Sequence, residues 1–225
     1  MSALPTRSPV RGVVFDLDGT LIDSSHDIAR AVNHALGALG FATLPPEIIA
    51  GYVGDGASLL IQRAAGIAAD DPRVAELYTA FLADYAAHPV VTTRVFPGVL
   101  SALRALAHLP LAVCTNKPRL TTDLVLRALD LERWFAAVVA GDDLPRKKPD
   151  PLPIQHLAER LAVPASALVM VGDGAQDIEA GRAAGALTVG VRHGIQPIER
   201  MLGASPDHVI GSLAELPALL TQLSL

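Results

Sequence analysis

Hydrophobic residues along the chain are grouped in short, almost uninterrupted runs that alternate with longer amphipathic stretches. The runs are rich in valine, leucine and alanine, which is typical of strands buried on both faces of a parallel sheet. The stretches between them repeat their apolar positions every three to four residues, as amphipathic helices do. We expect strands at residues 12–16, 111–114, 137–140, 168–171 and 187–191, and intervening helices at 99–107, 118–129, 150–161 and 175–184.

One long segment interrupts this alternation. Between residues 23 and 94 the sequence shows no clear strand, only alanine-rich and leucine-rich helical stretches. We therefore expect a doubly wound, Rossmann-like parallel α/β core formed by residues 1–22 and 95–225, with a small helical cap, residues 23–94, inserted after the first strand. A length of 225 residues suits one such domain with a modest insertion better than two equal domains. The expected cap helices cover residues 27–39, 56–65 and 73–87.

Composition and charge argue against a membrane protein, a secreted protein and a nucleic-acid-binding protein. Mean hydropathy is +0.38, yet no uncharged apolar run reaches the roughly 18 residues that cross a bilayer. Residues 1–10 contain two prolines and Arg7 but no apolar segment of a secretory signal. The net charge of −5 and the few aromatic residues offer no basic or stacking surface for nucleic acid. The single cysteine, Cys114, fits a reducing compartment, so we expect a soluble, cytoplasmic protein that binds neither membrane nor nucleic acid.

Polar residues follow the predicted strands at the edge of the sheet where a ligand crevice is expected. That crevice lies outside the carboxyl ends of parallel strands. Asp16 and Asp18 leave the first strand two positions apart, so both carboxylates point the same way. Gly19 then permits a sharp turn with an exposed N–H. Later strands are followed by Thr115-Asn116-Lys117, by Arg146-Lys147-Lys148, and by Gly172-Asp173 with Asp177 four residues on.

Each of these segments is a weak signal by itself, because each type of segment more often marks a helix cap or a turn. Their coincidence is informative, since four separate strand ends supply a hydroxyl, cations and carboxylates to one crevice. All three lysines of the chain, Lys117, Lys147 and Lys148, lie in these segments. The sequence therefore predicts a small site for an anion and a metal ion.

In four motifs the chain resembles the haloacid dehalogenase-like superfamily of phosphotransferases, and the resemblance covers nearly its whole length. Asp18 argues against the dehalogenase branch, which lacks this second aspartate. The resemblance implies a Mg²⁺-dependent phosphomonoester hydrolase that forms an aspartyl-phosphate on Asp16. The motifs are Asp16-Leu17-Asp18-Gly19-Thr20-Leu21, Thr115-Asn116, Lys148-Pro149, and Gly172-Asp173 with Asp177.

The acidic motif residues receive the following roles from the resemblance. Asp16 is expected to be the nucleophile and a metal ligand, and Asp173 contributes a second carboxylate to the metal. Asp18 is expected to give the metal its backbone carbonyl and to act as the acid and base with its side chain. Asp177 is counted with the metal group, where it orients Asp173 or a metal-bound water; alternatively it is a first-turn aspartate favoured by the helix dipole.

The remaining motif residues are expected to hold the phosphate. Thr115, Asn116 and the N–H of Gly19 are assigned to phosphate oxygens. Lys148 is expected to balance charge in the transition state, and it is preferred to Lys147 because Lys-Pro is the form found in the family.

The expected cap resembles that of the phosphoglycolate phosphatase family, although position 55 holds Asp55 where asparagine is more usual. We expect Gly54, Asp55 and Gly56 to bind the carboxylate of the substrate, with backbone N–H groups at the start of the following helix. The alternative is a plain glycine turn capped by Asp55. The matching segments are Gly51-Tyr52-Val53-Gly54-Asp55-Gly56-Ala57 and Tyr85-Ala86-Ala87-His88, followed by Phe96-Pro97-Gly98-Val99.

These patterns favour a small phosphorylated metabolite as substrate, and 2-phosphoglycolate in particular. A sugar-phosphate phosphatase and a phosphomutase are the alternatives, whereas a non-catalytic phosphate-binding regulator is disfavoured because both motif aspartates are intact. The cap has few cationic side chains with which to bind a second phosphate. It contains no lysine and only four arginines, Arg30, Arg63, Arg73 and Arg94. The oligomeric state stays open.

Three further residues have competing interpretations. Asp23 is expected to be the N-cap of the first cap helix, and Cys114 to be buried and inert. His193, which follows a predicted strand, either lines the crevice or serves a structural role.

Overall fold

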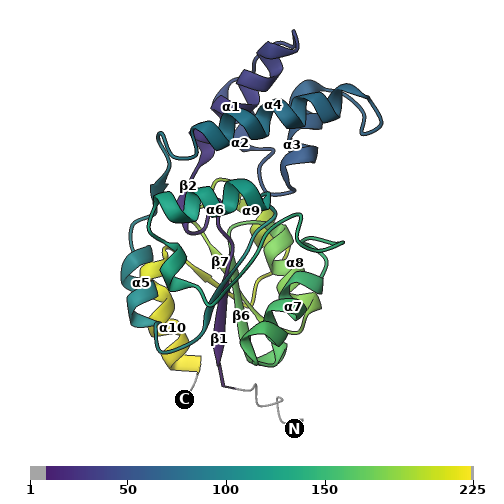
Figure 1. Ribbon diagram of the computed structural model, residues 1–225. Helices are drawn as coiled ribbons and strands as arrows, with labels where there is room; N and C mark the ends of the chain where they lie inside the picture. Colours follow the sequence, from purple (N-terminus) through teal and green to yellow (C-terminus); the bar gives the residue numbers. More distant parts are fainter. Residues whose placement is uncertain (1–8, 224–225) are drawn as a thin grey trace.

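The computed structural model describes residues 9–223, which form a parallel α/β core with a helical cap above it (Figure 1). The described residues do not include 1–8 and 224–225. Most of the segment considered as a secretory signal, and both ends of the expected core, fall in these two ranges. Among the described residues, no helix combines the length and apolar character needed to cross a membrane.

Within residues 9–223, the core is built around a sheet of six parallel strands in the order β5-β4-β1-β6-β7-β8. The chain winds outward in one direction from β1 to β5 and then returns to continue from β6 on the other side. Ligand crevices form where the strand order reverses in this way, at the carboxyl ends of the central strands. The strands are β1 (Gly12–Phe15), β4 (Leu111–Cys114), β5 (Ala137–Val139), β6 (Leu168–Gly172), β7 (Leu187–Val191) and β8 (His208–Ile210).

Alternate residues of the strands face two layers of helices. Val13 and Phe15 of β1 pack in one hydrophobic cluster with α5, α6 and α10, whereas Val14 packs in another with α7 and α8. Figure 1 shows α5 and α10 on one side of the sheet and α7 and α8 on the other. Both faces of the strands are therefore buried, which explains their uniformly apolar sequences. The helices are α5 (Val99–Ala105), α6 (Arg119–Ala128), α7 (Leu152–Leu161), α8 (Ala175–Ala183), α9 (Ile198–Gly203) and α10 (Leu216–Leu223).

The cap consists of helices α1 to α4, which lie beyond the carboxyl ends of the strands (Figure 1). Ile28 of α1, Leu60 of α3 and Phe81 of α4 are buried and belong to the same hydrophobic cluster as Val13 and Phe15 of the core. The structure thus has the predicted α/β class with a helical cap. The cap helices are α1 (Ser25–Ala38), α2 (Pro46–Ala50), α3 (Ala57–Ala65) and α4 (Arg73–Ala87).

Two very short strands carry the chain into and out of the cap. Strand β2 (Ile22–Asp23) pairs antiparallel with β3 (Arg94–Val95), so the outgoing and returning segments run side by side. This pairing joins residues far apart in sequence, and neither strand was expected.

Asp27 of α1 fastens the returning segment to the cap. Its buried carboxylate accepts the N–H groups of Val91, Thr92 and Thr93, the last at 2.8 Å, and the Thr93 hydroxyl at 2.6 Å. Burial by itself would raise the pKa of Asp27, but these hydrogen bonds outweigh it and lower the pKa to about 2. The carboxylate is therefore held in its charged form.

The predicted core elements agree with the structure to within two residues, whereas the C-terminal part and the start of the cap differ. The sequence patterns predicted neither β8 nor α2, α9 and α10, which are short elements. Helix α1 begins two residues before the expected start, and its N-cap is Ser24. Asp23 accepts the N–H of Ser25 at 3.1 Å instead, so the prediction that Asp23 is the N-cap is wrong by one position.

Candidate active site

The carboxyl ends of β1, β4 and β6 bring Asp16, Thr115 and Asp173 to one crevice, because each residue directly follows its strand. The N–H of Asp16 donates to the carbonyl of Val171, and that of Thr115 to the carbonyl of Val139, both at 2.9 Å. These bonds continue the pattern of the sheet beyond the strands. The side chains at this edge are therefore fixed by the rigid part of the core.

Three buried carboxylates lie at the centre of the crevice. Asp16, Asp173 and Asp177 each place a carboxylate oxygen within 4.8 Å of the others. Thr20 Oγ1 and the N–H of Ile195 donate to Asp173, at 3.1 and 2.9 Å, and orient its carboxylate. Burial raises the pKa of both Asp16 and Asp173 to about 7, because no water is available to solvate their charges.

This cluster has the donor chemistry of a site for a hard divalent cation. Carboxylates packed so closely repel one another unless protons or a cation balance their charge. Mg²⁺ prefers oxygen ligands of this kind and is commonly bound by one or two carboxylates. Asp18, for which we expected only a backbone contribution to the metal, directs its carboxylate to a different part of the site.

Lys148 is embedded among these carboxylates. Its Nζ donates to Asp16 Oδ1 at 2.8 Å, to Asp177 Oδ1 at 2.6 Å and to the carbonyl of Cys114 at 2.5 Å, and its side chain is 1% exposed. Burial alone would lower the pKa of Lys148, but the two carboxylates raise it well above the usual range. Asp177 also accepts the N–H of Gly174 at 2.9 Å at the start of α8, so its helix-capping role and its contact with Lys148 coexist.

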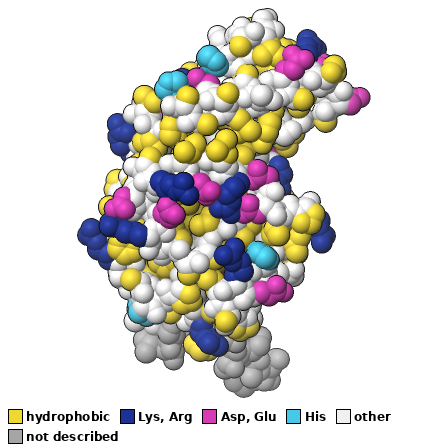
Figure 2. Space-filling model, in the orientation of Figure 1, with side chains coloured by type: hydrophobic (Ala, Val, Ile, Leu, Met, Phe, Trp, Pro, Cys, Tyr) yellow, Lys and Arg dark blue, Asp and Glu magenta, His cyan; other side chains and the backbone are white. Residues whose placement is uncertain are grey.

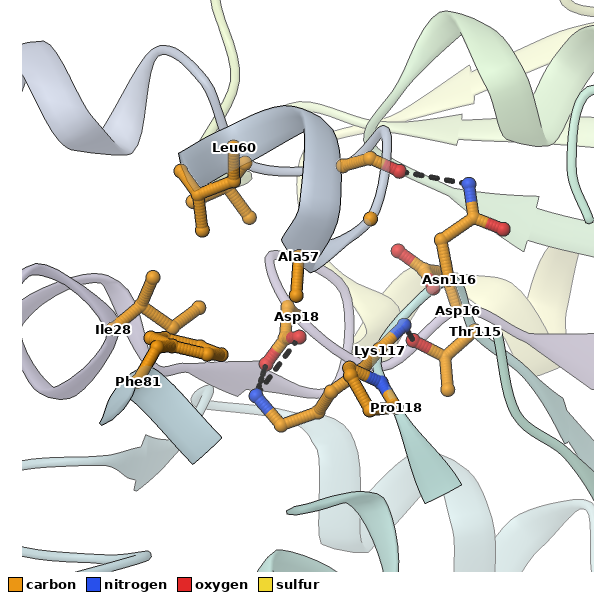
Figure 3. A pocket seen from close by; sticks show the side chains of 13 residues that line it. Asp16, Asp18, Ile28, Ala57, Leu60, Phe81, Thr115, Asn116, Lys117 and Pro118 are labelled. Carbon is orange, nitrogen blue, oxygen red and sulfur yellow. Dashed lines mark hydrogen bonds and ion pairs between the residues drawn. The ribbon is translucent and has the colours of Figure 1, made fainter. Parts of the chain in front are cut away.

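Asp18 lies at the cap side of the crevice, where it meets Lys117. Lys117 Nζ is 3.2 Å from both carboxylate oxygens of Asp18 (Figure 3). It also donates to the hydroxyl of Tyr85, on cap helix α4, at 2.9 Å. Ser24 Oγ donates to Asp18 Oδ1 at 2.5 Å. We assigned no role to Lys117 from the sequence; the signal for one was that all lysines of the chain lie in the motif segments.

Two of the expected phosphate donors are engaged elsewhere in this structure. The N–H of Gly19 donates to the carbonyl of Ile22 at 2.8 Å. Asn116 Nδ2 donates to the carbonyl of Gly54 at 2.8 Å (Figure 3) and to that of Lys148 at 2.9 Å. The Asn116 side chain therefore ties the cap loop to the core, a contact that the sequence pattern did not indicate.

The expected carboxylate-binding loop is divided. Gly54 and Gly56 line the crevice, whereas the carboxylate of Asp55 pairs with Arg63 of the cap at 2.6 Å and is not among the lining residues. Lys147 Nζ donates to the carbonyl of Asp55 at 2.6 Å. Lys147 thus contacts the cap loop, whereas Lys148, the lysine preferred from the sequence, contacts Asp16.

Core and cap together enclose a small pocket of about 40 Å³. One end of it is polar, with Asp16, Asp18 and Thr115; the other is apolar, with cap residues such as Ile28 and Phe81 (Figure 3). Such a space suits a small ligand with its charged groups toward the core. The lining residues are Asp16, Asp18, Ile28, Val53, Gly54, Gly56, Ala57, Leu60, Phe81, Thr115, Asn116, Lys117 and Pro118.

The remaining candidates have structural roles in this arrangement. His193 Nε2 lies 3.0 Å from the carbonyl of Thr20, and its ring stacks on Phe96 with 4.3 Å between ring centres. Cys114 is buried, as expected, and burial raises the pKa of its thiol to about 12.

Figure 2 shows basic and acidic side chains intermixed on the core beneath the cap.

The sequence and fold match known proteins along nearly the whole chain. The family model described as haloacid dehalogenase-like hydrolase matches residues 13–191. The chain belongs to this family. A crystal structure of a predicted phosphoglycolate phosphatase from Haemophilus somnus superposes with a TM-score of 0.87 at 28% identity and covers 94% of this chain and 98% of that one.

Within the family, the chain is similar to curated phosphoglycolate phosphatases. It is 40% identical to the enzyme of Neisseria meningitidis over 216 residues, which are 92% of each chain. It is 41% identical to that of Chromobacterium violaceum over 214 residues, with 92% of this chain and 95% of the relative covered. The protein is therefore a phosphatase of the haloacid dehalogenase-like hydrolases.

Proposed function

We propose that this phosphatase hydrolyses 2-phosphoglycolate to glycolate and phosphate, with Mg²⁺ as cofactor and an aspartyl-phosphate on Asp16 as intermediate. The observation that carries the proposal is the position of Asp16 at the end of the central strand, where it accepts a hydrogen bond from the charged Lys148 and lies within 4.8 Å of two further buried carboxylates. The similarity to phosphoglycolate phosphatases supports the choice of substrate.

Asp16 serves as the nucleophile in this proposal. One of its carboxylate oxygens is bound to Lys148, and the carboxylate lines the pocket in which the ester would lie. An oxygen of Asp16 attacks phosphorus, the bond from phosphorus to the ester oxygen breaks, and Asp18 gives a proton to the leaving alkoxide. Asp18 then takes a proton from the water that hydrolyses the acyl phosphate, which returns Asp16 to its starting state.

The metal site proposed here uses the carboxylates of Asp16 and Asp173 and the backbone carbonyl of Asp18. A bound Mg²⁺ supplies positive charge to the phosphate oxygens and helps to align the ester. Asp177 was grouped with the metal ligands from the sequence. Its 2.6 Å contact with Lys148 supports a different role, in which Asp177 holds the lysine against Asp16 and the phosphate.

The pocket and the cap support a small substrate. About 40 Å³ is room for about three water-sized groups, so only a small ligand can lie beneath the cap, and the cap loop is tied down by Asn116 and Lys147. We keep the proposed division into a core of residues 1–22 and 95–225 and a cap of residues 23–94.

The single buried cysteine is compatible with a cytoplasmic enzyme.

The test is phosphate release from a panel of small phosphoesters that includes phosphoglycolate, ethyl phosphate and glucose phosphates. We expect the highest kcat/KM for phosphoglycolate. Preference for a glucose phosphate would favour a sugar-phosphate phosphatase, and conversion of one glucose phosphate into another without phosphate release would favour a phosphomutase.

Removal of the metal gives a second test of the same proposal. A chelator should abolish activity, and added Mg²⁺ should restore it. Because burial raises the pKa of Asp16 and Asp173 to about 7, bound metal must displace protons below that pH. The Mg²⁺ concentration needed for half-maximal activity should therefore rise as the pH falls from about 8 to 6; full activity in excess chelator would refute the metal site.

A further inference from the structure

Lys117 is the cation of the pocket that the proposed chemistry does not use. Lys148 donates its three ammonium hydrogens to two carboxylates and a carbonyl, and Lys147 donates to the carbonyl of Asp55 in the cap loop and is not among the residues that line the pocket. Among the described residues that line the pocket, Lys117 is the one with a positively charged side chain. Its side chain is 4% exposed, so its charge is poorly screened by solvent.

The ammonium group of Lys117 is held by the core and the cap together. Its three donors meet the hydroxyl of Tyr85 at 2.9 Å and the two carboxylate oxygens of Asp18 at 3.2 Å each, so a ligand anion would take over one of the two longer contacts with Asp18. Figure 3 shows the ammonium beside Asp18, on the side of the pocket where Ile28 and Phe81 lie. A ligand whose phosphate is at Asp16 would extend toward this side as it fills the pocket.

A second source of positive potential faces the same pocket. Helix α3 has nine residues, begins at Ala57 and has no side-chain cap on its first turn. Gly56 and Ala57 both line the pocket, and Figure 3 shows this end of α3 next to Asp18. The unpaired N–H groups of a helix start attract anions. Lys117 and this end of α3 therefore face the same part of the pocket, where the carboxylate of Asp18 lies beside both.

We propose that Lys117 is the residue that selects carboxylate-bearing phosphoesters, by donating an ammonium hydrogen to the substrate carboxylate, in place of one of its two contacts with Asp18, opposite the start of α3. This inference rests on the proposed function and extends it, since it names the group that recognises the second anion. Lys117 depends on the cap for this task, because Tyr85 of α4 holds its ammonium group at 2.9 Å and its ring lies 4.3 Å away.

The competing explanation is that Lys117 only positions Asp18, the proton donor. The two roles differ in how the effect of a substitution depends on the substrate. A residue that only positions Asp18 affects every alkyl phosphate alike, whereas a residue that binds the carboxylate affects only substrates that have one. The test therefore needs two substrates with the same alkyl leaving group.

The experiment compares phosphoglycolate with phosphoglycolamide, its neutral amide of nearly the same shape, in the wild type and in Lys117→Met. We expect the wild type to prefer phosphoglycolate. In Lys117→Met the ratio of the two kcat/KM values should fall by about 30-fold or more, as loss of a charged hydrogen bond in a buried site predicts. Turnover of phosphoglycolamide by the variant shows that it is folded.

Inhibition provides a measurement that does not depend on proton transfer. The inhibition constant of 3-phosphonopropionate, which has a carboxylate, should weaken by about 30-fold in Lys117→Met, while that of propylphosphonate changes little. The matched control is Lys147→Met, which should change both inhibitors by the same factor. Lys117→Arg, which keeps a cation, should retain most of the preference and covers the case in which Lys117→Met fails to fold.

Two outcomes overturn the inference and separate it from the proposed function. If the wild type prefers phosphoglycolate but Lys117→Met loses activity on both substrates equally, Lys117 does not read the carboxylate and the proposed function stands. If the wild type shows no preference for phosphoglycolate over its amide, both fall.

Discussion

The core end of the active site, around Lys148, and its cap end, around Lys117, hold their lysines in different ways. Lys148 makes all three of its contacts with core residues, on Asp16, Asp177 and the carbonyl of Cys114. Lys117 is shared between Asp18 of the core and Tyr85 of the cap. The core end is therefore complete without the cap, whereas the cap end exists only while the cap lies against the core.

This difference separates two requirements of the enzyme. Groups that make and break bonds must be fixed to within a fraction of an ångström, and the sheet fixes them. Groups that recognise the rest of a substrate can be assembled by closure, which also excludes water from the reaction. Changes at the core end should therefore affect all substrates alike, and changes at the cap end should affect the choice among them.

The largest loss is expected from Asp16→Asn. Asparagine has nearly the same shape but cannot form an acyl phosphate, so kcat should fall by at least about 10⁴-fold on substrates with and without a carboxylate. Phosphate release measures the rate, and thermal unfolding checks that the variant is folded. Turnover near the wild-type rate would show that another residue is the nucleophile.

Lys148→Ala should be the next most damaging change. It removes a charge held 2.8 Å from Asp16 Oδ1, and loss of such a preorganised contact typically costs about 10³-fold in kcat. The variant should also unfold at a lower temperature, because Asp16 and Asp177 lose their common partner. Lys147→Ala is the matched control and should be far milder; the reverse order of effects would contradict the assignment.

Asp18→Asn tests the residue at which the two ends meet. Without its acid, the enzyme should lose about 10²-fold or more in kcat on phosphoglycolate, whose alkoxide needs a proton. The loss on nitrophenyl phosphate should be much smaller, since nitrophenolate leaves without help. Similar losses on the two substrates would argue against proton transfer by Asp18.

Gly56→Ala should alter the cap end alone. Gly56 has a φ of +92°, which favours glycine, and an added Cβ would overlap Lys147 Nζ. Lys147 Nζ can move aside, but the strained φ and the contact of the added Cβ with the carbonyl oxygen of Asn116 at 3.3 Å should shift the loop and lower kcat/KM for phosphoglycolate by about 10-fold and for nitrophenyl phosphate by less. Gly66→Ala is the control, because Gly66 has a φ of +66° with no atom within 4 Å of the added Cβ. If Gly56→Ala and Gly66→Ala lowered kcat/KM equally, the effect at Gly56 would be due to backbone strain alone and not to its place at the pocket.

The smallest effect on turnover is expected from Asp27→Asn, which should instead lower the free energy of unfolding by about 2 kcal/mol at neutral pH. The pKa of Asp27 is lowered from 3.8 to about 2 in the folded protein. The stabilisation is therefore fully present above about pH 4 and is lost as the pH falls toward 2. The difference in unfolding temperature between wild type and variant should shrink over that range; a constant difference would show that charge is not involved.

The core end was largely predictable from the sequence because its signals are local. The apolar runs place strands β1, β4 and β6, and parallel strands bring the residues that follow them to one edge. Asp16 and Asp173 meet there for that reason, and Lys148 reaches them from the loop that follows the neighbouring strand β5. Strand β8 was not predicted because its sequence contains no apolar run. It is three residues long, begins with His208 and is only half-buried at two positions.

The contacts of the cap end could not be predicted in the same way. Tyr85 lies 32 positions from Lys117, on a different helix, and no periodic pattern records which face of α4 meets which loop. The contacts of Asn116 were also not predictable. The sequence pattern assigned its amide to the phosphate, whereas Nδ2 donates to the carbonyls of Gly54 and Lys148. Pairings between distant segments depend on how the cap docks, and that is a property of the packed structure.

The paired strands β2 and β3 have a consequence for the history of such enzymes. Because Ile22 pairs with Val95 and Asp23 with Arg94, the chain leaves the core and returns to it at adjacent points. A segment attached in this way can be lengthened, shortened or replaced without stretching the sheet, since closure entropy rises only slowly with the length inserted. The hydrolytic machinery could thus be inherited unchanged while successive inserts adapted it to new metabolites.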